Sequence, residues 1–172
     1  MKAFVVDVNV AIVANEKSSQ AATDCIKSCQ DALQSVVADG IVVLDDAMLI
    51  LDEYRRNLSM AGQPGLGDFF FKWLWDHQRT DSRCEIVCLT QDTQGDFVHF
   101  PCCVELQKFD RSDRKYVAAA LASHKAPEVL NAVDKHWWDF RESLAANGVN
   151  VRFVCPHHFT NAHAKRRPGR RK

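Results

Sequence analysis

Short apolar runs that alternate with longer helical patterns are the feature of this sequence that most restricts its fold. Apolar runs of four to seven residues bounded by polar or turn-forming residues are typical of buried strands. We predict strands over residues 3–7, 41–44, 85–89, 129–133 and 149–155, with a further one over 102–106. Helical patterns occupy residues 18–37, 47–59, 69–78, 113–125 and 137–148. This alternation predicts an α/β protein with a three-layer α/β/α fold and a central, mainly parallel sheet.

Length and charge distribution divide the chain into one domain and a tail. A chain of 172 residues with 47% hydrophobic and 26% charged residues is typical of a single globular domain. Six of the 22 basic residues lie in the last eight, KRRPGRRK, so residues 1–164 hold 16 basic and 22 acidic residues, a formal charge of −6. We predict a domain over residues 1–160 and a basic, disordered tail over 161–172. Such a tail either adds affinity for a polyanion or is a solvated end without function.

The cysteines and the apolar content indicate a reduced, cytoplasmic protein. The N-terminal apolar stretch is short and is interrupted by Asp7, so it does not resemble a signal peptide. The seven cysteines are therefore expected to be free thiols, most of them in the core. No apolar run is long enough to span a membrane. Cys155, His157, His158 and His163 are zinc-type ligands, but a surface histidine cluster is the preferred interpretation because their spacing fits no paired-ligand pattern.

Acidic side chains end strands or lie in helices at several places. They are Asp7 and Asp134 after predicted strands, Asp113 at the start of a helix with Asp110 just before it, and Glu53 among apolar residues of another helix. Each alone has an ordinary explanation, since an aspartate caps a helix and a glutamate pairs with an arginine one turn away. The carboxyl ends of parallel strands form the ligand-binding edge of a sheet, so we expect these acids to converge. Converging carboxylates favour a hard divalent cation such as Mg²⁺ or Mn²⁺.

The order of these residues resembles that of the PIN-domain nucleases. The shared features are V-D-x-N at the first strand, an isolated glutamate in the helix after the second strand, the segment D-R-S-D-R-K-Y-V-A-A-A-L, and V-L-N-A-V-D at the next strand. The resemblance covers residues 3 to about 155. The chain is similar to stand-alone bacterial members of the family, of the type found as toxin ribonucleases in toxin–antitoxin pairs. The resemblance implies a PIN-like fold.

For the site, the resemblance implies that four acids are catalytic and bind Mg²⁺ or Mn²⁺: Asp7, Glu53, Asp113 and Asp134. Asn9 would hold the Asp7 carboxylate or a metal-bound water, and Asp110 would be a neighbour of the metal ligands. Asp110 and Asp113 compete for one role, and Asp113 is preferred because it directly opens the helix.

A departure from the family pattern follows the fourth acid. Many PIN domains carry a further acid soon after it, whereas here His136, Trp137 and Trp138 precede Asp139. The number of metal ions, one or two, therefore stays open. The two tryptophans are expected to pack in the core, with stacking on exposed bases as the second interpretation.

The activity implied by the resemblance is metal-dependent cleavage of phosphodiester bonds in single-stranded RNA, by an endoribonuclease. Arg111, Arg114 and Lys115 lie close in sequence to the acids and are expected to bind phosphates of the substrate, although each one singly is better explained as a solvated charge. Further expected partners are a second copy of the chain and an antitoxin protein. The aromatic stretch 69–75 is either part of the core or an interface with such a partner.

Two other classes of function compete with the nuclease. One is a catalytically inactive PIN-like module that binds RNA or a partner protein. The other is a phosphatase of the haloacid-dehalogenase type, which is disfavoured because its D-x-D motif requires an aspartate where this chain has Asn9. A role as a toxin, in RNA processing or in defence stays open.

Overall fold

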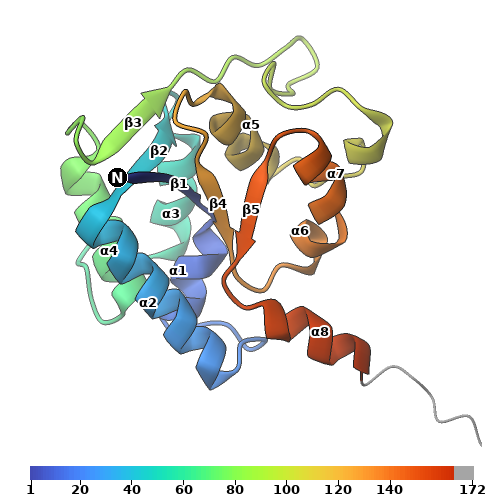
Figure 1. The fold of residues 1–172 in the computed structure, drawn as a ribbon. Helices are drawn as coiled ribbons and strands as arrows, with labels where there is room; N and C mark the ends of the chain where they lie inside the picture. The colour runs from blue at the N-terminus through green and yellow to red at the C-terminus, as the bar shows by residue number, and fades with distance from the viewer. Residues whose placement is uncertain (165–172) are drawn as a thin grey trace, which may run out of the picture.

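A parallel sheet of five strands forms the centre of the protein. The computed structural model describes residues 1–164 of the chain. The strands are β1 (Lys2–Val6), β2 (Gly40–Asp45), β3 (Cys84–Val87), β4 (Glu128–Asn131) and β5 (Asn150–Phe153), in the order β3-β2-β1-β4-β5 (Figure 1). Every pair of neighbouring strands is parallel. The predicted central sheet is therefore confirmed.

Helices cover both faces of this sheet. They are α1 (Val8–Ala14), α2 (Thr23–Asp39), α3 (Leu49–Asn57), α4 (Leu66–His77), α5 (Arg114–Ala122), α6 (Lys135–Asp139), α7 (Arg141–Ala146), α8 (Pro156–Ala164) and a short 3₁₀ helix, η1 (Val104–Leu106). In the view of Figure 1, α2 lies in front of the sheet and α5 behind it. The packing of α2 against β2, and of α5 against β1, β2 and β4, completes the three-layer α/β/α fold. None of the helices in the described part of the chain is long and apolar enough to cross a membrane.

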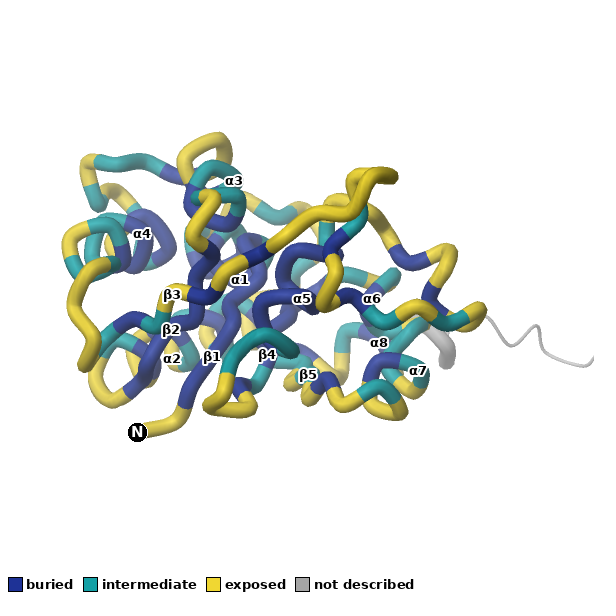
Figure 2. Tube along the Cα trace, turned by 90° about the horizontal axis from the view of Figure 1, so that it is seen from above, coloured by how far each residue is buried: buried dark blue, intermediate teal, exposed yellow. Residues whose placement is uncertain are grey.

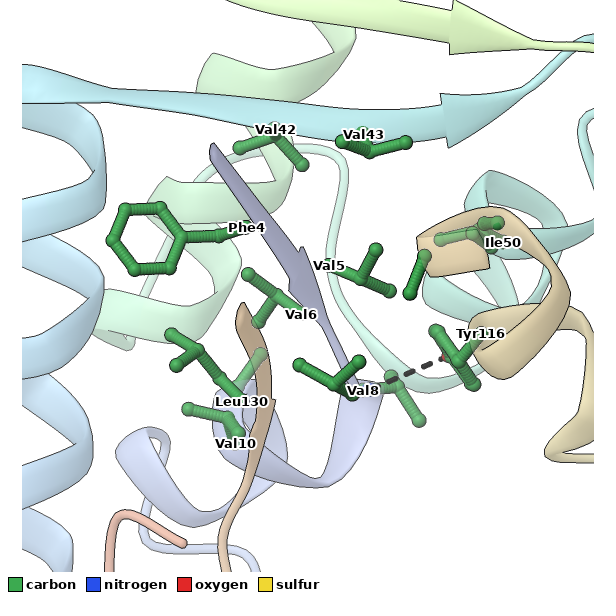
Figure 3. Packing of buried hydrophobic residues seen from close by; sticks show 14 of the residues in the cluster. Phe4, Val5, Val6, Val8, Val10, Val42, Val43, Ile50, Tyr116 and Leu130 are labelled. Atoms are coloured by element: carbon green, nitrogen blue, oxygen red, sulfur yellow. Dashed lines mark hydrogen bonds between the residues drawn. The ribbon is translucent and has the colours of Figure 1, made fainter. Parts of the chain in front are cut away.

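The core lies on both sides of β1. Phe4, Val5 and Val6 are buried together with residues of β2 and β4, and Figure 3 shows Val42, Val43 and Leu130 against them. Because both faces of the sheet are covered, the central strands β1 and β2 are continuous apolar runs, whereas the edge strand β5 alternates exposed and half-buried residues. Figure 2 shows the buried strands at the centre, with exposed segments around them.

Helix α1 follows β1 without a loop, and the sequence analysis did not predict it. Asp7 is the N-cap residue of α1, and its Oδ1 atom accepts a hydrogen bond from the backbone N–H of Asn9 at 2.9 Å. The apolar residues of α1 pack against α2 and α4. Gly67 permits this approach, since a Cβ atom built on it would lie 2.1 Å from the carbonyl oxygen of Ala11.

The strand predicted over residues 102–106 is wrong. This segment belongs to the long connection between β3 and α5, and residues 104–106 form η1. The backbone N–H of Leu106 donates to the carbonyl of Cys103, so this turn is closed locally and not by a neighbouring strand. Val104 points outward with 76% of its surface exposed, whereas Leu106 is buried. The apolar residues of this segment are therefore those of a surface turn.

Other predicted boundaries shift by a few residues. The predicted helix over 137–148 is two helices, α6 and α7, which meet at Phe140. Helix α8 continues to Ala164, past the predicted domain end at residue 160. The remainder of the predicted basic tail, residues 165–172, lies outside the described residues.

The expectation that all cysteines are free thiols is wrong for two of them. Cys25 and Cys155 form a disulfide, with 5.3 Å between their Cα atoms. The sequence pattern could not show this, because the two residues are 130 positions apart. They meet only in the folded chain, where the segment between β5 and α8 lies against α2. Cys29 and Cys84 are free and buried, as expected for cysteines that serve as small core residues.

Candidate functional site

Asp7 lies where β1 ends and α1 begins. Its side chain is buried, with 3% of its surface exposed. The capping contact to Asn9 uses one carboxylate oxygen, so the ordinary explanation for this acid holds locally. The second oxygen, Oδ2, accepts a hydrogen bond from the side-chain amide of Asn131 at 3.1 Å. Asp7 is therefore both a helix cap and a member of a buried polar group.

Asn131, at the end of β4, is a site residue that the sequence analysis missed. It is fully buried, although it lies in a run that the sequence predicts as an apolar strand, and a polar residue in the middle of such a run is the signal that could have found it. The Oδ1 atom of Asn9 accepts the backbone N–H of Ala132 at 2.9 Å. The remaining amide atoms, Nδ2 of Asn9 and Oδ1 of Asn131, have no partner among the described residues. Buried amide atoms without partners favour a ligand or water beside Asp7.

Glu53 faces inward from α3 and does not form the surface pair with Arg56 that was its ordinary explanation. Its Oε2 atom lies 2.6 Å from Nζ of Lys115 and accepts a hydrogen bond of 2.8 Å from the hydroxyl of Tyr116. Lys115 was predicted to bind phosphate. In this structure its ammonium group pairs with an acid of the site.

Asp113 lies at the start of α5 but makes no capping hydrogen bond. Its Oδ2 atom accepts a hydrogen bond of 3.1 Å from the indole N–H of Trp137. Trp137 is fully buried, so it packs in the core and does not offer a surface for stacking bases. The carboxylate of Asp113 is therefore held by Trp137 of α6 and does not cap α5.

Asp110 and Asp134 take part in local turns. Asp134 is the N-cap of α6 and accepts the backbone N–H of His136 at 2.7 Å. Asp110 accepts both the backbone N–H and the hydroxyl of Ser112, each at 2.9 Å, and these hydrogen bonds hold the pKa of Asp110 below its ordinary value. The hydrogen bonds of Asp110 come from its own turn, whereas Asp113 is held by Trp137 and its charge acts on Asp7, which favours Asp113 over Asp110 for the shared role.

The charges of the neighbouring acids raise the pKa of Asp7 and of Asp113. Burial raises the pKa of Asp7 well above its ordinary value, and the charges of Asp113, Glu53 and Asp134 raise it further, against the hydrogen bond from Asn9. Burial and then the charges of Asp134 and Asp110 raise the pKa of Asp113 to about 6, while Lys115 acts in the opposite direction. The fold thus brings the four acids into one electrostatic unit with more negative charge than its surroundings compensate.

This donor set fits a hard divalent cation. Carboxylate and amide oxygens are the ligands that Mg²⁺ and Mn²⁺ prefer, and a cation would offset the repulsion that raises the two pKa values. Among the described residues, no three carboxylates bring oxygen atoms within 4.8 Å of one another. The acids are therefore gathered without forming a closed ligand cage, and Lys115 supplies part of the positive charge.

Arg114 does not match the expectation of a substrate contact. Its side chain is buried, its guanidinium donates to the backbone carbonyls of Phe109 and Gln107, and it forms an ion pair with Asp96. It also lies over the ring of Phe100, 4.4 Å from the ring centroid. These contacts hold the connection between β3 and α5, and they occupy the guanidinium with groups of its own loop although Arg114 lines the same groove as Arg111.

Arg111 is the basic residue that stays open to substrate. It is exposed and makes one hydrogen bond, from its guanidinium to the carbonyl of Gln94 at 2.9 Å. It lines a groove of about 870 Å³ in the connection after β3, together with Phe97 and Phe100. Arg111 is two residues from Asp113, so one of the residues that line the groove is close in sequence to the acidic site.

Comparisons of the chain with protein-family models, with curated proteins and with solved structures find no match. The functional assignment therefore depends on the residues of the site and on their arrangement. The structure gathers Asp7, Glu53, Asp113 and Asp134, adds Asn131 and Trp137, and holds Arg114 in contacts with its own loop.

Proposed function

We propose that this protein is a PIN-like, metal-dependent endoribonuclease that cleaves single-stranded RNA. The observation that carries the proposal is the convergence of four acids, one directly after β1, one within α3 and one at the start of each of α5 and α6, of which Asp7 is buried with a strongly raised pKa. A buried negative charge such as that of Asp7 destabilises a fold unless a positive charge offsets it. A site of this composition is suited to a cation and, through it, to the charge of a phosphodiester.

Asp7, Glu53, Asp113 and Asp134 would hold Mg²⁺ or Mn²⁺. When bound, such an ion supplies Lewis acidity and stabilises negative charge on a phosphoryl group. The residues around the acids set their directions. Asn131 and the N–H of Asn9 fix the two oxygens of Asp7, and Trp137 fixes one oxygen of Asp113.

Two basic residues would act on the substrate side. Arg111 is exposed beside the groove and would contact a phosphate next to the one that is cleaved. Lys115 holds Glu53 in place in the metal-free protein, and its charge favours the approach of a polyanion to an otherwise acidic site.

One observation favours a second candidate, a PIN-like module that binds RNA or a partner without cleaving it. Lys115 lies 2.6 Å from Glu53, so an internal cation already neutralises one of the four acids. A protein that keeps this ion pair permanently would need no metal and would lack the corresponding activity.

The test is cleavage of labelled single-stranded RNA and of DNA of matching sequence, with Mn²⁺, with Mg²⁺ and with chelator. The wild type is compared with Asp7→Asn and with a matched control, Asp76→Asn, which changes an exposed acid paired with Lys72 on α4. RNA cleavage that needs metal, survives in the control and is lost in Asp7→Asn supports the nuclease. Cleavage that persists in Asp7→Asn contradicts it, and RNA binding without any cleavage favours the inactive module.

A further inference from the structure

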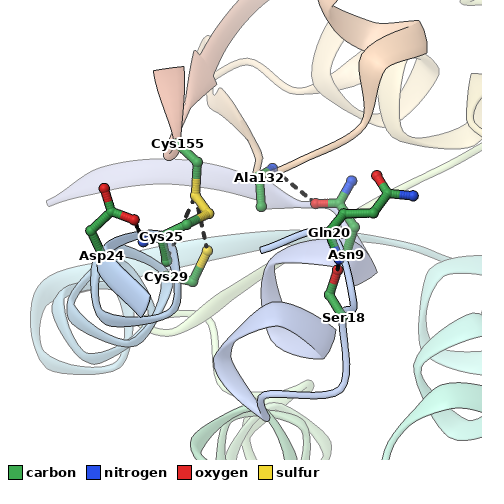
Figure 4. Close-up of a disulfide and its surroundings, with 8 residues drawn as sticks. All are labelled: Asn9, Ser18, Gln20, Asp24, Cys25, Cys29, Ala132 and Cys155. Atoms are coloured by element: carbon green, nitrogen blue, oxygen red, sulfur yellow. Dashed lines mark hydrogen bonds between the residues drawn. A yellow bond between two sulfur atoms is a disulfide. The ribbon is translucent and has the colours of Figure 1, made fainter. Parts of the chain in front are cut away.

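Three buried cysteines from distant parts of the chain meet beside α2. Cys25 and Cys29 lie on α2, and Cys155 lies between β5 and α8. Their sulfur atoms are all within 4.8 Å of one another, and Figure 4 shows the three side chains converging. Cys25 and Cys155 share the disulfide, and the Sγ atom of Cys29 lies 3.8 Å from that of Cys155. A free thiol is therefore in contact with an existing disulfide bond.

The helix explains why two cysteines reach the same partner. Residues four apart on a helix lie on the same face, one turn above the other. Cys25 and Cys29 therefore both present their sulfur atoms toward the strand that ends before Cys155. A disulfide needs only one of them, so the buried position of Cys29 beside the bond is not explained by the Cys25–Cys155 pair alone.

We propose that these residues form a thiol–disulfide centre in which Cys155 bonds to either Cys25 or Cys29. In both forms the C-terminal segment that begins at Cys155 is covalently fastened to α2. The centre makes the fastening tolerant of the loss or modification of one α2 cysteine. It is a property of the fold and does not depend on the proposed nuclease.

The exchange needs no external oxidant. The Cys29 thiol gives up its proton, and its sulfur attacks Sγ of Cys155. A Cys29–Cys155 bond forms, the Cys25–Cys155 bond breaks, and the Cys25 sulfur leaves as a thiolate that takes up a proton. The first bond, formed from two thiols, requires a two-electron oxidant such as a small-molecule disulfide, which is reduced to two thiols as the protein pair is oxidised.

Burial slows the exchange between the two forms. Burial raises the pKa of Cys29 to about 12, so very little Cys29 thiolate is present at neutral pH and its attack is slow. The Cys25–Cys155 bond therefore persists in the folded protein, and Cys29 is the reserve partner.

The segment that the disulfide fastens packs against residues next to those that hold Asp113. Phe159 of α8 stacks on Trp138 with ring centroids 4.6 Å apart, and it also contacts Phe153 of β5. Trp138 is the neighbour of Trp137, whose indole holds Asp113. A bond at Cys155 thus holds the start of α8 at the position from which Phe159 completes this aromatic group.

The test oxidises the full chain with oxidised glutathione, alkylates the remaining thiols at acidic pH and maps the disulfides by mass spectrometry. The proteins are the wild type, Cys25→Ser, Cys29→Ser and the double variant, with Cys84→Ser as the matched control at a buried cysteine of β3. We expect Cys25–Cys155 in the wild type, in Cys29→Ser and in the control. We expect Cys29–Cys155 in more than half of the Cys25→Ser molecules, and neither bond in the double variant.

A folded Cys25→Ser protein in which Cys155 stays free, or carries glutathione, would overturn the proposal. Folding is checked by circular dichroism. Stoichiometric binding of Zn²⁺ to the reduced wild type, with loss of disulfide formation, would also overturn it, because the cluster would then be a metal site.

A second measurement does not depend on the mapping. Because each bond closes a loop of well over a hundred residues, its reduction should lower the melting temperature on the order of 10 °C. This drop is expected in the wild type and in both single variants, but not in the double variant. A Cys25→Ser protein whose melting temperature does not respond to reductant contradicts the role given to Cys29.

Discussion

The side-chain amide of Asn131 donates a hydrogen bond of 3.1 Å to Oδ2 of Asp7, and so joins the carboxyl ends of the neighbouring strands β4 and β1. The other oxygen of Asp7 accepts the backbone N–H of Asn9. Both oxygens of the buried carboxylate therefore have fixed directions before a ligand binds. Residues that orient a ligating carboxylate in this way contribute strongly to metal affinity.

Removing this orienting contact should weaken the site. We expect Asn131→Ala to lower Mn²⁺ affinity and RNA cleavage by about 10- to 100-fold, because Asp7 loses the partner of one oxygen. Stability should fall by about 1–3 kcal/mol, since a buried acceptor is left unsatisfied. Calorimetric titration with Mn²⁺ and cleavage rates measure the first effect, and urea unfolding the second. The matched control is Asn150→Ala, at an exposed residue that begins β5. An Asn131→Ala protein with unchanged Mn²⁺ affinity would show that the contact is only structural.

The raised pKa of Asp7 predicts a gain in stability from neutralising it. A carboxyl group whose pKa is higher in the folded than in the unfolded protein imposes no penalty below its unfolded pKa of about 3.9, and imposes the full penalty above its folded pKa. With chelator present, Asp7→Asn should therefore be more stable than the wild type at pH 8, with the difference shrinking toward pH 4. The unpartnered Oδ1 of Asn131 can accept from the new amide after a flip. Urea unfolding at a series of pH values measures the difference, and a wild type that is the more stable protein at pH 8 contradicts the prediction.

Metal should stabilise the protein in a pH-dependent way. At a Mn²⁺ concentration about 100-fold above its dissociation constant, we expect a rise in melting temperature of roughly 5–10 °C at pH 7.5. The pKa of Asp113 is about 6, so at pH 5 this acid is largely protonated and the shift should be much smaller. Chelator should reverse the shift, and Asp7→Asn should lack it. Thermal melts with and without Mn²⁺ at both pH values give the result. An equal shift at pH 5 and pH 7.5 would exclude Asp113 as a ligand.

The sequence predicted the sheet well because its central strands β1 and β2 are continuous apolar runs, as both faces of a parallel sheet require. Asp7, Asp113 and Asp134 were candidates because they follow such runs or start helices, which places them at one edge of the sheet, and their metal binding stays a prediction. Helix α1 was missed since Val8–Ala14 is apolar apart from Asn9, and only Asp7 separates it from the apolar run of β1. Only the cap at Asp7 marks the change from strand to helix.

Residues whose role depends on distant contacts could not be assigned from the pattern. Asn131 and Asp7 are 124 positions apart, and only the pairing of β1 with β4 brings them together. Arg114 and Arg111 look alike in sequence, yet one is buried under its own loop and the other is exposed. The same limit applies to Cys155, whose partners lie on α2.

Arg114 and Arg111 should give opposite results. Arg114→Ala removes a buried guanidinium, so Asp96 loses its ion pair, and we expect a loss of about 3–5 kcal/mol of stability. Arg111→Ala removes an exposed side chain and should change stability by less than about 0.5 kcal/mol, while weakening RNA binding severalfold and reducing its salt dependence. Urea unfolding and binding to labelled RNA at two salt concentrations separate the effects. An Arg114→Ala protein of normal stability would restore this residue as a candidate substrate contact.

Lys115 distinguishes the nuclease from the inactive module. Its ammonium lies 2.6 Å from Glu53, so in the metal-free protein it compensates a charge that a metal ion would otherwise offset. If the two cations compete, Lys115→Met frees Glu53 and should raise Mn²⁺ affinity by about tenfold, the change expected from roughly 1.4 kcal/mol. The pKa of Asp113 should rise at the same time, because Lys115 lowers it, so the gain should be clear at pH 8 and small at pH 5.

Calorimetric titration with Mn²⁺ at both pH values makes the measurement, with Lys135→Met, at an exposed ion pair on α6, as the matched control. Weaker Mn²⁺ binding in Lys115→Met would mean that Lys115 positions Glu53 for the metal instead of competing with it, and no binding in any variant would leave the ion pair as the permanent state of the site.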